Sequence, residues 1–331
     1  MVGVFPRDGC GLAVDPDCTV PTNVTLTFRF DRFLNPVSVA RQSLRVYSGD
    51  PRVGVPFTFD VVYDPIERVV EYRVPPGATY QPRTLYQVEL FVADPSTNTL
   101  GIRAVDGAPL ADGDLPLRFS FLTGDMPVEV TPLPVPPSCD EIVEQVFGTL
   151  GSCAGRECHR RQDNALLGTD APLGDAPHQL WLDNPASFAA SAITRVARQT
   201  EVGDVSGGPS TPQSERFGVR MALIEPSSPG GSYLMYKLLL SPSNFEPCPP
   251  DAEESLCAEA VSPPVSSHQF LPLAEGESLV PPPAELDRLY SWFIQGEAMP
   301  RFNTQGRRGN VRLEGLRALS RFIAAGAACD E

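Results

Sequence analysis

Two cysteines and a histidine lie within seven positions, in the run Cys153-Ala-Gly-Arg-Glu-Cys158-His159. In the usual Cys-x-x-Cys-His signal, the two thiols add to the vinyl groups of a haem and the imidazole ligates its iron. Here four residues separate the cysteines instead of two. A longer spacer can bulge outward and still let both thiols reach one porphyrin edge. The pattern predicts one covalently attached haem c, held by Cys153 and Cys158, with His159 as the proximal iron ligand.

The same three residues have two other interpretations. Cys153 and Cys158 can form a disulfide that closes a small loop and leaves His159 at the surface. All three can instead be zinc ligands, although no second cysteine pair supplies the fourth ligand that a closed zinc site needs. The sequence alone leaves these alternatives open.

The composition describes an acidic globular protein. The chain has 331 residues, of which 42% are hydrophobic, so a wholly disordered chain is excluded. At about 150 residues per domain, this length predicts two domains. The net charge is −15, from 41 acidic and 26 basic residues, which argues against a nucleic-acid partner. If the acidic surface has a function, it favours a basic redox partner.

Eight cysteines are an even number, as expected of an exported protein whose thiols are mostly paired. Besides the motif, the expected disulfides are Cys10 with Cys18, Cys248 with Cys257, and Cys139 with Cys329. All eight cysteines are accounted for either with haem on Cys153 and Cys158 or with a fourth disulfide between these two residues. The number of cysteines therefore does not discriminate between haem attachment and a disulfide.

No run of 18 uninterrupted apolar residues is present, so no transmembrane segment is expected. The first residues, MVGVFPRDGC, have neither the basic nor the apolar region of a signal peptide. With the cysteine count, this favours a mature exported chain whose leader has been removed. A lipid anchor would then belong to an N-terminus not present here.

Alternation of apolar and polar residues predicts strands in the first part of the chain. The alternating runs are 24–30, 70–74, 86–92 and 117–121. Turn signals separate them at 48–51, 63–65, 75–77 and 106–114. This spacing indicates an antiparallel β-sandwich over residues 1–124. Five prolines within 125–137 then predict an extended linker.

From residue 138 the apolar spacing becomes helical, which predicts a second domain over 138–331. Ser138 and Glu141 form a capping-box pattern, and Asn184-Pro185 opens a second helix that runs through Val196. Further helices are predicted over 232–240, 282–297 and 311–327. The stretches 201–214 and 241–283 are rich in Pro, Gly and Ser. A small helical domain with such loops needs disulfides or a cofactor for cohesion.

The first domain resembles a bacterial Ig-like domain of the S-layer type. The matching runs are VPTNVTLTFRFDRFLNPVSV, VVYDP, YQPRTLYQVEL, GAPL and RFSFLTG. The resemblance implies an Ig-like sandwich that serves as a spacer or an adhesive module.

The second domain resembles the cytochrome c-like domains of planctomycete and myxobacterial exported proteins. Besides the Cys-x4-Cys-His variant, the matching runs are QLWLD at 179–183, EPSSPGGSYLMYKL at 225–238 and ELDRLYSWFIQG at 285–296. The resemblance implies a mainly helical haem domain with long loops. It also implies that a bridge from Cys139 to Cys329 ties together the helix pair that packs in cytochromes.

A cytochrome of this kind needs a distal ligand, often a Met followed by Pro before the last helix. Met299-Pro300 has this position, so the resemblance implies Met299 as the distal ligand. Related domains often carry Met-Pro-Pro earlier, where this chain has Val280-Pro281-Pro282. The alternatives left open are His178, His268, Met221 and an open coordination site.

The expected function is therefore outer-sphere electron transfer by an exported or surface-anchored protein, in the periplasm or at the cell surface. No Gly-x-Ser-x-Gly, phosphate-binding Gly loop or His-Glu-x-x-His is present, so an electron carrier is favoured over an enzyme. The alternative is a haem-free envelope protein, stapled by disulfides, that acts in structure or adhesion.

Overall fold

The computed structural model describes residues 1–49, 51–92, 101–110, 117–128, 135–149, 180–182, 184–197, 221–246, 271–273, 278–294 and 311–329. Contacts between residues divide the chain into two compact units. The first unit is Met1–Leu133 with Ser266–Glu277, and the second is Pro134–Val265 with Ser278–Glu331. A short piece of the C-terminal half therefore belongs to the first unit.

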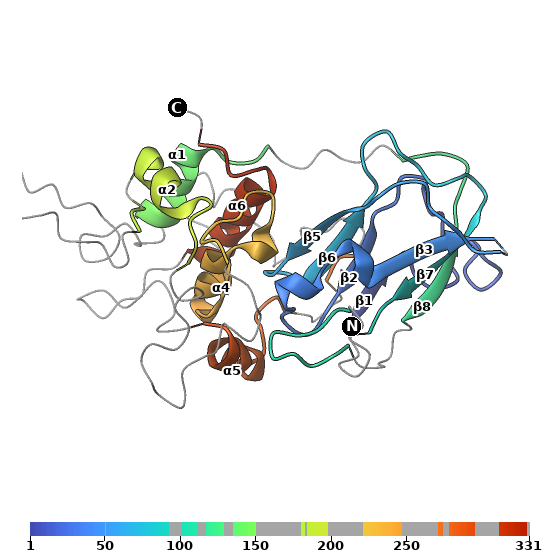
Figure 1. The fold of residues 1–331 in the computed structure, drawn as a ribbon, viewed down its shortest axis with the longest axis horizontal. Coiled ribbons are helices and arrows are strands. Elements are labelled where there is room, and N and C mark those ends of the chain that lie inside the picture. Colours follow the sequence, from blue (N-terminus) through green and yellow to red (C-terminus); the bar gives the residue numbers. More distant parts are fainter. Residues whose placement is uncertain are drawn as a thin grey trace, which may run out of the picture. The chain divides into compact units, whose positions relative to one another are not determined.

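The first unit contains two four-stranded antiparallel sheets (Figure 1). The first sheet has the order β1 (Gly3–Phe5), β2 (Leu26–Arg29), β6 (Val69–Arg73) and β5 (Asp60–Asp64). The second has the order β4 (Val53–Gly54), β3 (Leu44–Ser48), β7 (Leu85–Leu90) and β8 (Arg118–Leu122). Two short 3₁₀ helices, η1 (Pro36–Ser38) and η2 (Arg41–Ser43), precede β3.

Aromatic side chains from both sheets form the core of the first unit. Phe28 of β2 lies opposite Val70 of β6, and its ring is 6.0 Å from that of Phe119 on β8. Tyr80 contacts Phe121 of β8, with ring centroids 5.7 Å apart. All of these side chains are buried. The predicted alternation of apolar and polar positions is confirmed in β8, where Phe119 and Phe121 are buried between more exposed neighbours, whereas in β2 all four residues, Thr27 and Arg29 included, are buried.

The chain at Gly9 and Cys10, where the loop closed by the Cys10–Cys18 disulfide begins, pairs with β8, the edge strand of the second sheet. Gly9 N donates to Ser120 O at 2.8 Å, and Leu122 N donates to Cys10 O at 2.9 Å. The N–H and C=O groups of an exposed edge strand invite pairing with another chain. The disulfide loop occupies part of that edge in β8.

The observed strands differ from the predicted ones in number and length. Strands β1, β3, β4 and β5 were not predicted individually, because all four have at most five residues and no long alternation. The run at 86–92 is shorter as a strand, since β7 ends at Leu90 and Val92 makes an isolated bridge with Ile102.

The described helices of the second unit begin with α1 (Cys139–Glu141), which continues into the π-helix η3 (Ile142–Thr149). The others are α2 (Pro185–Ala192), α4 (Tyr233–Leu239), α5 (Pro283–Trp292) and α6 (Arg312–Ala324). Two 3₁₀ helices, η7 (Pro229–Gly231) and η8 (Pro242–Phe245), flank α4. No helix within the described ranges is long and apolar enough to cross a membrane.

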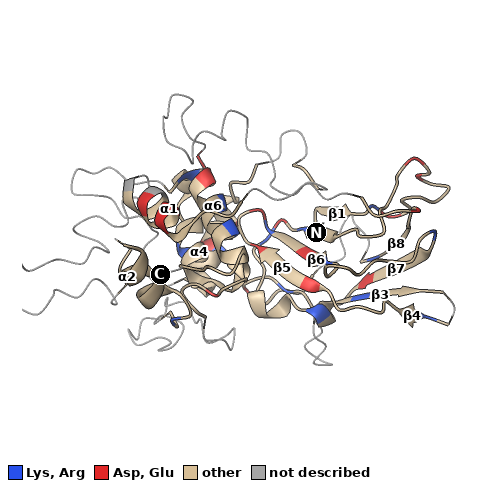
Figure 2. Ribbon diagram, turned by 90° about the horizontal axis from the view of Figure 1, so that it is seen from above, with Lys and Arg blue, Asp and Glu red and all other residues tan. Residues whose placement is uncertain are grey.

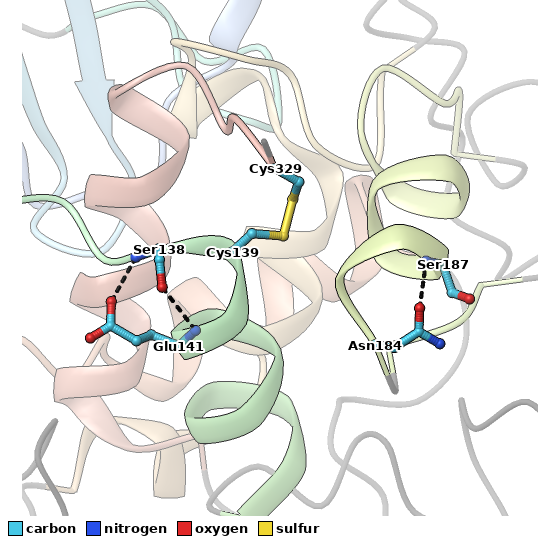
Figure 3. The surroundings of a disulfide bond; sticks show 6 residues. All are labelled: Ser138, Cys139, Glu141, Asn184, Ser187 and Cys329. Atoms are coloured by element: carbon cyan, nitrogen blue, oxygen red, sulfur yellow. Dashed lines mark hydrogen bonds between the residues drawn. A yellow bond between two sulfur atoms is a disulfide. The ribbon is translucent and has the colours of Figure 1, made fainter. Parts of the chain in front are cut away.

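The predicted capping box at the start of α1 is confirmed (Figure 3). Glu141 N donates to the Ser138 hydroxyl at 3.2 Å, and Ser138 N donates to a Glu141 carboxylate oxygen at 2.7 Å. Asp140 and Glu141 also place negative charge in the first turn, where the helix dipole favours it (Figure 2).

Three predicted helices extend well beyond the observed ones, and one of them is the helix predicted over 311–327, since α6 ends at Ala324. The helix from Asn184 ends at Ala192 instead of Val196, because Ile193 and Val196 form β-bridges with Ile224 and Ala222. Helix α5 ends at Trp292 instead of 297. The architecture is therefore mixed β and α. A cytochrome c-like fold for the second unit stays a prediction.

Candidate functional site

The residues predicted to hold haem lie outside the described residues. This applies to Cys153, Cys158, His159 and Met299, and equally to His178, His268, Cys248 and Cys257. The structure therefore brings none of them together and separates none of them. It does describe the elements on both sides of the motif.

The element that leads into the motif is η3, which ends at Thr149, four residues before Cys153. Ile142, Val146 and Phe147 of this helix are buried. Helix η3 packs against α6, where Gly315 faces Val146. A Cβ at Gly315 would come within 3.8 Å of Val146 Cγ1 and 3.1 Å of Val311 Cγ1. The distance to Val146 is an ordinary van der Waals contact, so the absence of a side chain at Gly315 matters chiefly for the crowding with Val311 at the start of α6.

Residues 180–182, which follow the motif, are anchored to α2. Trp181 N donates to the Ser191 hydroxyl at 3.0 Å, and that hydroxyl donates to Trp181 O at 3.0 Å. Phe188 of α2 then contacts Phe147 of η3, with ring centroids 5.4 Å apart. The described elements on either side of the motif, η3 before it and residues 180–182 with α2 after it, thus contact each other.

The disulfide between Cys139 and Cys329 joins the first turn of α1 to the residues that follow α6 (Figure 3). Its Cα atoms are 5.1 Å apart, although the cysteines are separated by 190 positions. Two of the predicted disulfides, this one and Cys10–Cys18, are therefore present in the structure. The predicted Cys248–Cys257 bridge lies outside the described residues.

Met221 is the one alternative iron ligand that falls within the described residues. Its backbone carbonyl accepts a hydrogen bond from Ala197 N at 2.7 Å, and the residue is buried. No cluster of three or more His, Cys, Asp or Glu that suits a metal ion occurs in the part of the chain that the structure describes.

A second cluster of aromatic rings joins α4 to the end of α5. The ring of Phe293 lies 4.7 Å from that of Tyr236 and 5.8 Å from that of Tyr233. The Tyr236 hydroxyl donates to Gly230 O at 2.9 Å. These contacts pack Phe293, the residue that follows α5, against two buried tyrosines of α4.

Sequence reasoning missed a buried ion pair in the first unit. Arg29 and Glu67 have side chains that are 6% and 0% exposed, with Nη2 and Oε2 3.5 Å apart. Arg29 occupies an outward position of the alternating run, which predicts a solvated side chain. The acidic residue in the turn between β5 and β6 was the available signal, but only the folded chain brings it to Arg29.

Comparison with protein-family profiles and with curated proteins finds no match. Among solved structures, domains 1–6 of surface layer protein SbsC match 36% of this chain at 10% identity, with a TM-score of 0.23. The S-layer protein rSbsC(31-844) matches 36% at 12% identity, with a TM-score of 0.22. The chain covers 14% and 13% of those two proteins. Similarity this weak identifies neither a fold nor a function.

Proposed function

We propose that this protein is an exported or surface-anchored electron carrier with one haem c attached to the second unit through Cys153 and Cys158. His159 is the proximal ligand and Met299 the distal ligand. The observation that carries the proposal is the spacing of two thiols and an imidazole directly after a buried, stapled helix. The first unit serves as an Ig-like spacer.

The donor chemistry of this chain fits the group. Two thiols form thioether links to a haem, and an adjacent imidazole ligates its iron. Cys10, Cys18, Cys139 and Cys329 are paired with each other in the structure, so they do not compete for the motif cysteines. The described helices that flank the motif in sequence, η3 and α2, also pack together through Phe147 and Phe188.

The haem, when bound, supplies one-electron redox chemistry. Cys153 and Cys158 would hold it through thioether links, and the His159 imidazole would ligate its iron. The Met299 thioether would raise the reduction potential relative to a second imidazole. The acidic surface, with a net charge of −15, favours a basic redox partner.

The proposed location is the periplasm or the cell surface. Disulfides persist in oxidising compartments and are rare in the cytosol, and the structure contains two of them. The same two disulfides favour a second candidate, a haem-free structural or adhesive protein of the envelope. In that case Cys153 and Cys158 form a further bridge and His159 carries no iron.

The test is expression of the full chain in a host with haem-maturation machinery, followed by absorption spectroscopy and mass measurement. A Soret band and the added mass of one haem are expected. Changing Cys153→Ser together with Cys158→Ser abolishes both signals, whereas the matched pair Cys10→Ser with Cys18→Ser retains them. Met299→Ala keeps the haem but lowers the potential. A colourless protein with a mapped Cys153–Cys158 disulfide overturns the proposal in favour of the second candidate.

A further inference from the structure

Residues 271–273, Leu-Pro-Leu, belong to the first unit although the helices on either side of them in sequence belong to the second. They come from the long stretch between η8 and α5. Four residues, 274–277, join Leu273 to Ser278, where the chain returns to the second unit. The chain therefore crosses between the units three times, instead of once through a proline-rich linker.

The guanidinium of Arg29 holds this short segment. Arg29 Nη2 donates to Leu271 O at 2.7 Å, and Nη1 donates to Pro272 O at 3.1 Å. Nη2 also contacts the Glu67 carboxylate at 3.5 Å. The side chains of Arg29 and Glu67 are almost completely buried, at 6% and 0% exposed. A buried charge is costly unless it is paired and hydrogen-bonded, so the two carbonyls complete the surroundings of this cation.

Gly3 of β1 provides space for the apolar part of the segment. A Cβ built at Gly3 would lie 3.1 and 3.2 Å from the two methyl carbons of Leu271. Such distances are shorter than ordinary carbon contacts, so any larger residue at position 3 would push Leu271 away. Gly3 lies opposite Arg29 in the β1–β2 pair. The Leu271 side chain and the two carbonyls that Arg29 binds therefore contact paired positions of the same sheet.

We propose that residues 271–273 form a strap and that Arg29 is the latch that fixes it to the first unit. The site made by Gly3, Arg29 and Glu67 accepts an extended segment with an apolar side chain and two free carbonyls. Pro272 suits this role because proline restricts the segment to an extended form and has no N–H to satisfy. This inference is independent of haem binding.

The test is limited proteolysis of the full chain with chymotrypsin, whose sites after Phe270 and Leu273 border the strap. Wild-type protein is cleaved slowly there. Arg29→Gln is expected to raise the cleavage rate within 266–277 about tenfold or more, because cleavage follows the population of the open form. Arg45→Gln is the matched control, since Arg45 lies on β3 in the other sheet, exposed and over the Phe91 ring. It leaves the rate unchanged.

A second variant guards against a folding defect in Arg29→Gln. Gly3→Val leaves the Arg29–Glu67 pair intact and displaces Leu271, so it too is expected to speed cleavage about tenfold. Near-ultraviolet circular dichroism of the tyrosine core verifies that each variant is folded. If folded Arg29→Gln and Gly3→Val are both cleaved at the wild-type rate, the strap proposal is wrong. If only Gly3→Val folds, its cleavage rate decides.

Discussion

The side-chain amide of Asn23 pairs with the backbone of Val128, 105 positions later. Asn23 Nδ2 donates to Val128 O at 2.8 Å, and Val128 N donates to Asn23 Oδ1 at 3.0 Å. In this pairing, the side-chain amide of Asn23 makes the two hydrogen bonds that a backbone partner makes in an antiparallel β-ladder. It fixes Val128, within the proline-rich stretch, to the first unit near the point where the chain leaves that unit.

Asn23→Ala is therefore expected to lower the free energy of unfolding by about 1 kcal/mol, the usual net value of a solvent-accessible hydrogen bond. The loss is measured by urea denaturation of the full chain. Asn23→Asp is the control, because it keeps the acceptor for Val128 N and loses only the donor. An equal loss in both variants would mean that the donated bond to Val128 O supplies the whole effect.

A buried amide in the second unit should matter more. Asn244 Nδ2 donates to Leu238 O at 2.8 Å, and Asn244 Oδ1 accepts from Val311 N at 3.0 Å, so this side chain connects α4 to the start of α6. Asn244 is fully buried. Asn244→Ala removes the acceptor of the buried Val311 N, while Leu238 O keeps its bond from Ser241 N, and the change is expected to cost about 2–4 kcal/mol in urea unfolding. A loss no larger than that of Asn23→Ala would contradict this interpretation.

Two buried tyrosines of the first unit differ in how their hydroxyls are satisfied. The Tyr86 hydroxyl accepts from Gln81 N at 2.9 Å, whereas the Tyr80 hydroxyl has no hydrogen-bond partner within the described residues. Tyr86→Phe is expected to lower the free energy of unfolding by about 1 kcal/mol, and Tyr80→Phe to leave it equal or raise it. Thermal unfolding of both variants tests the contrast. A large destabilisation by Tyr80→Phe would indicate a partner for its hydroxyl outside the described residues.

Alkaline pH should unfold the first unit through the same core. Burial raises the pKa of Tyr72 and of Tyr80 well above the ordinary value of 10.0, with the neighbouring Tyr86 adding to the rise at Tyr80. Because the folded-state pKa is the higher one, this stability is fully present below pH 10 and is lost as pH rises beyond it. Each tyrosine is expected to lower the free energy of unfolding by about 1.4 kcal/mol per pH unit above pH 10.

The measurement for this pH dependence is urea unfolding between pH 9 and pH 11.5. Tyr80→Phe removes one of the two ionising groups, so it should reduce the steepness of the loss. The same slope in wild type and Tyr80→Phe would show that other groups dominate alkaline unfolding.

The Cys10–Cys18 disulfide should protect an edge strand. At the start of its loop, Gly9 N donates a hydrogen bond to Ser120 O of β8, and Cys10 O accepts one from Leu122 N. Changing both cysteines to Ser frees the loop, so β8 gains access to other chains and self-association should rise with concentration. Analytical ultracentrifugation of this double variant against wild type measures the effect. A double variant as monodisperse as wild type would show that the loop stays on β8 without its disulfide.

Local rules were enough to predict several features. The capping box at Ser138 and the helix start at Asn184 follow from contacts that lie within three residues. The alternation around Phe119 likewise predicts which side chains of β8 enter the core, because the period of a strand is two. The pairing of Cys10 with Cys18 follows from their nearness in sequence. The Cys-x4-Cys-His spacing remains a prediction that rests on the same kind of local pattern.

Tertiary structure decided what depends on distant partners. Arg29 is a buried latch because the chain brings Glu67 and residues 271–273 to it, although its place in the alternation predicts a solvated side chain. The helix from Asn184 ends early because Ile224 offers Ile193 a backbone partner. Local sequence determines the conformations a segment prefers. Which buried polar groups find partners depends on residues tens or hundreds of positions away, so only the folded chain settles it.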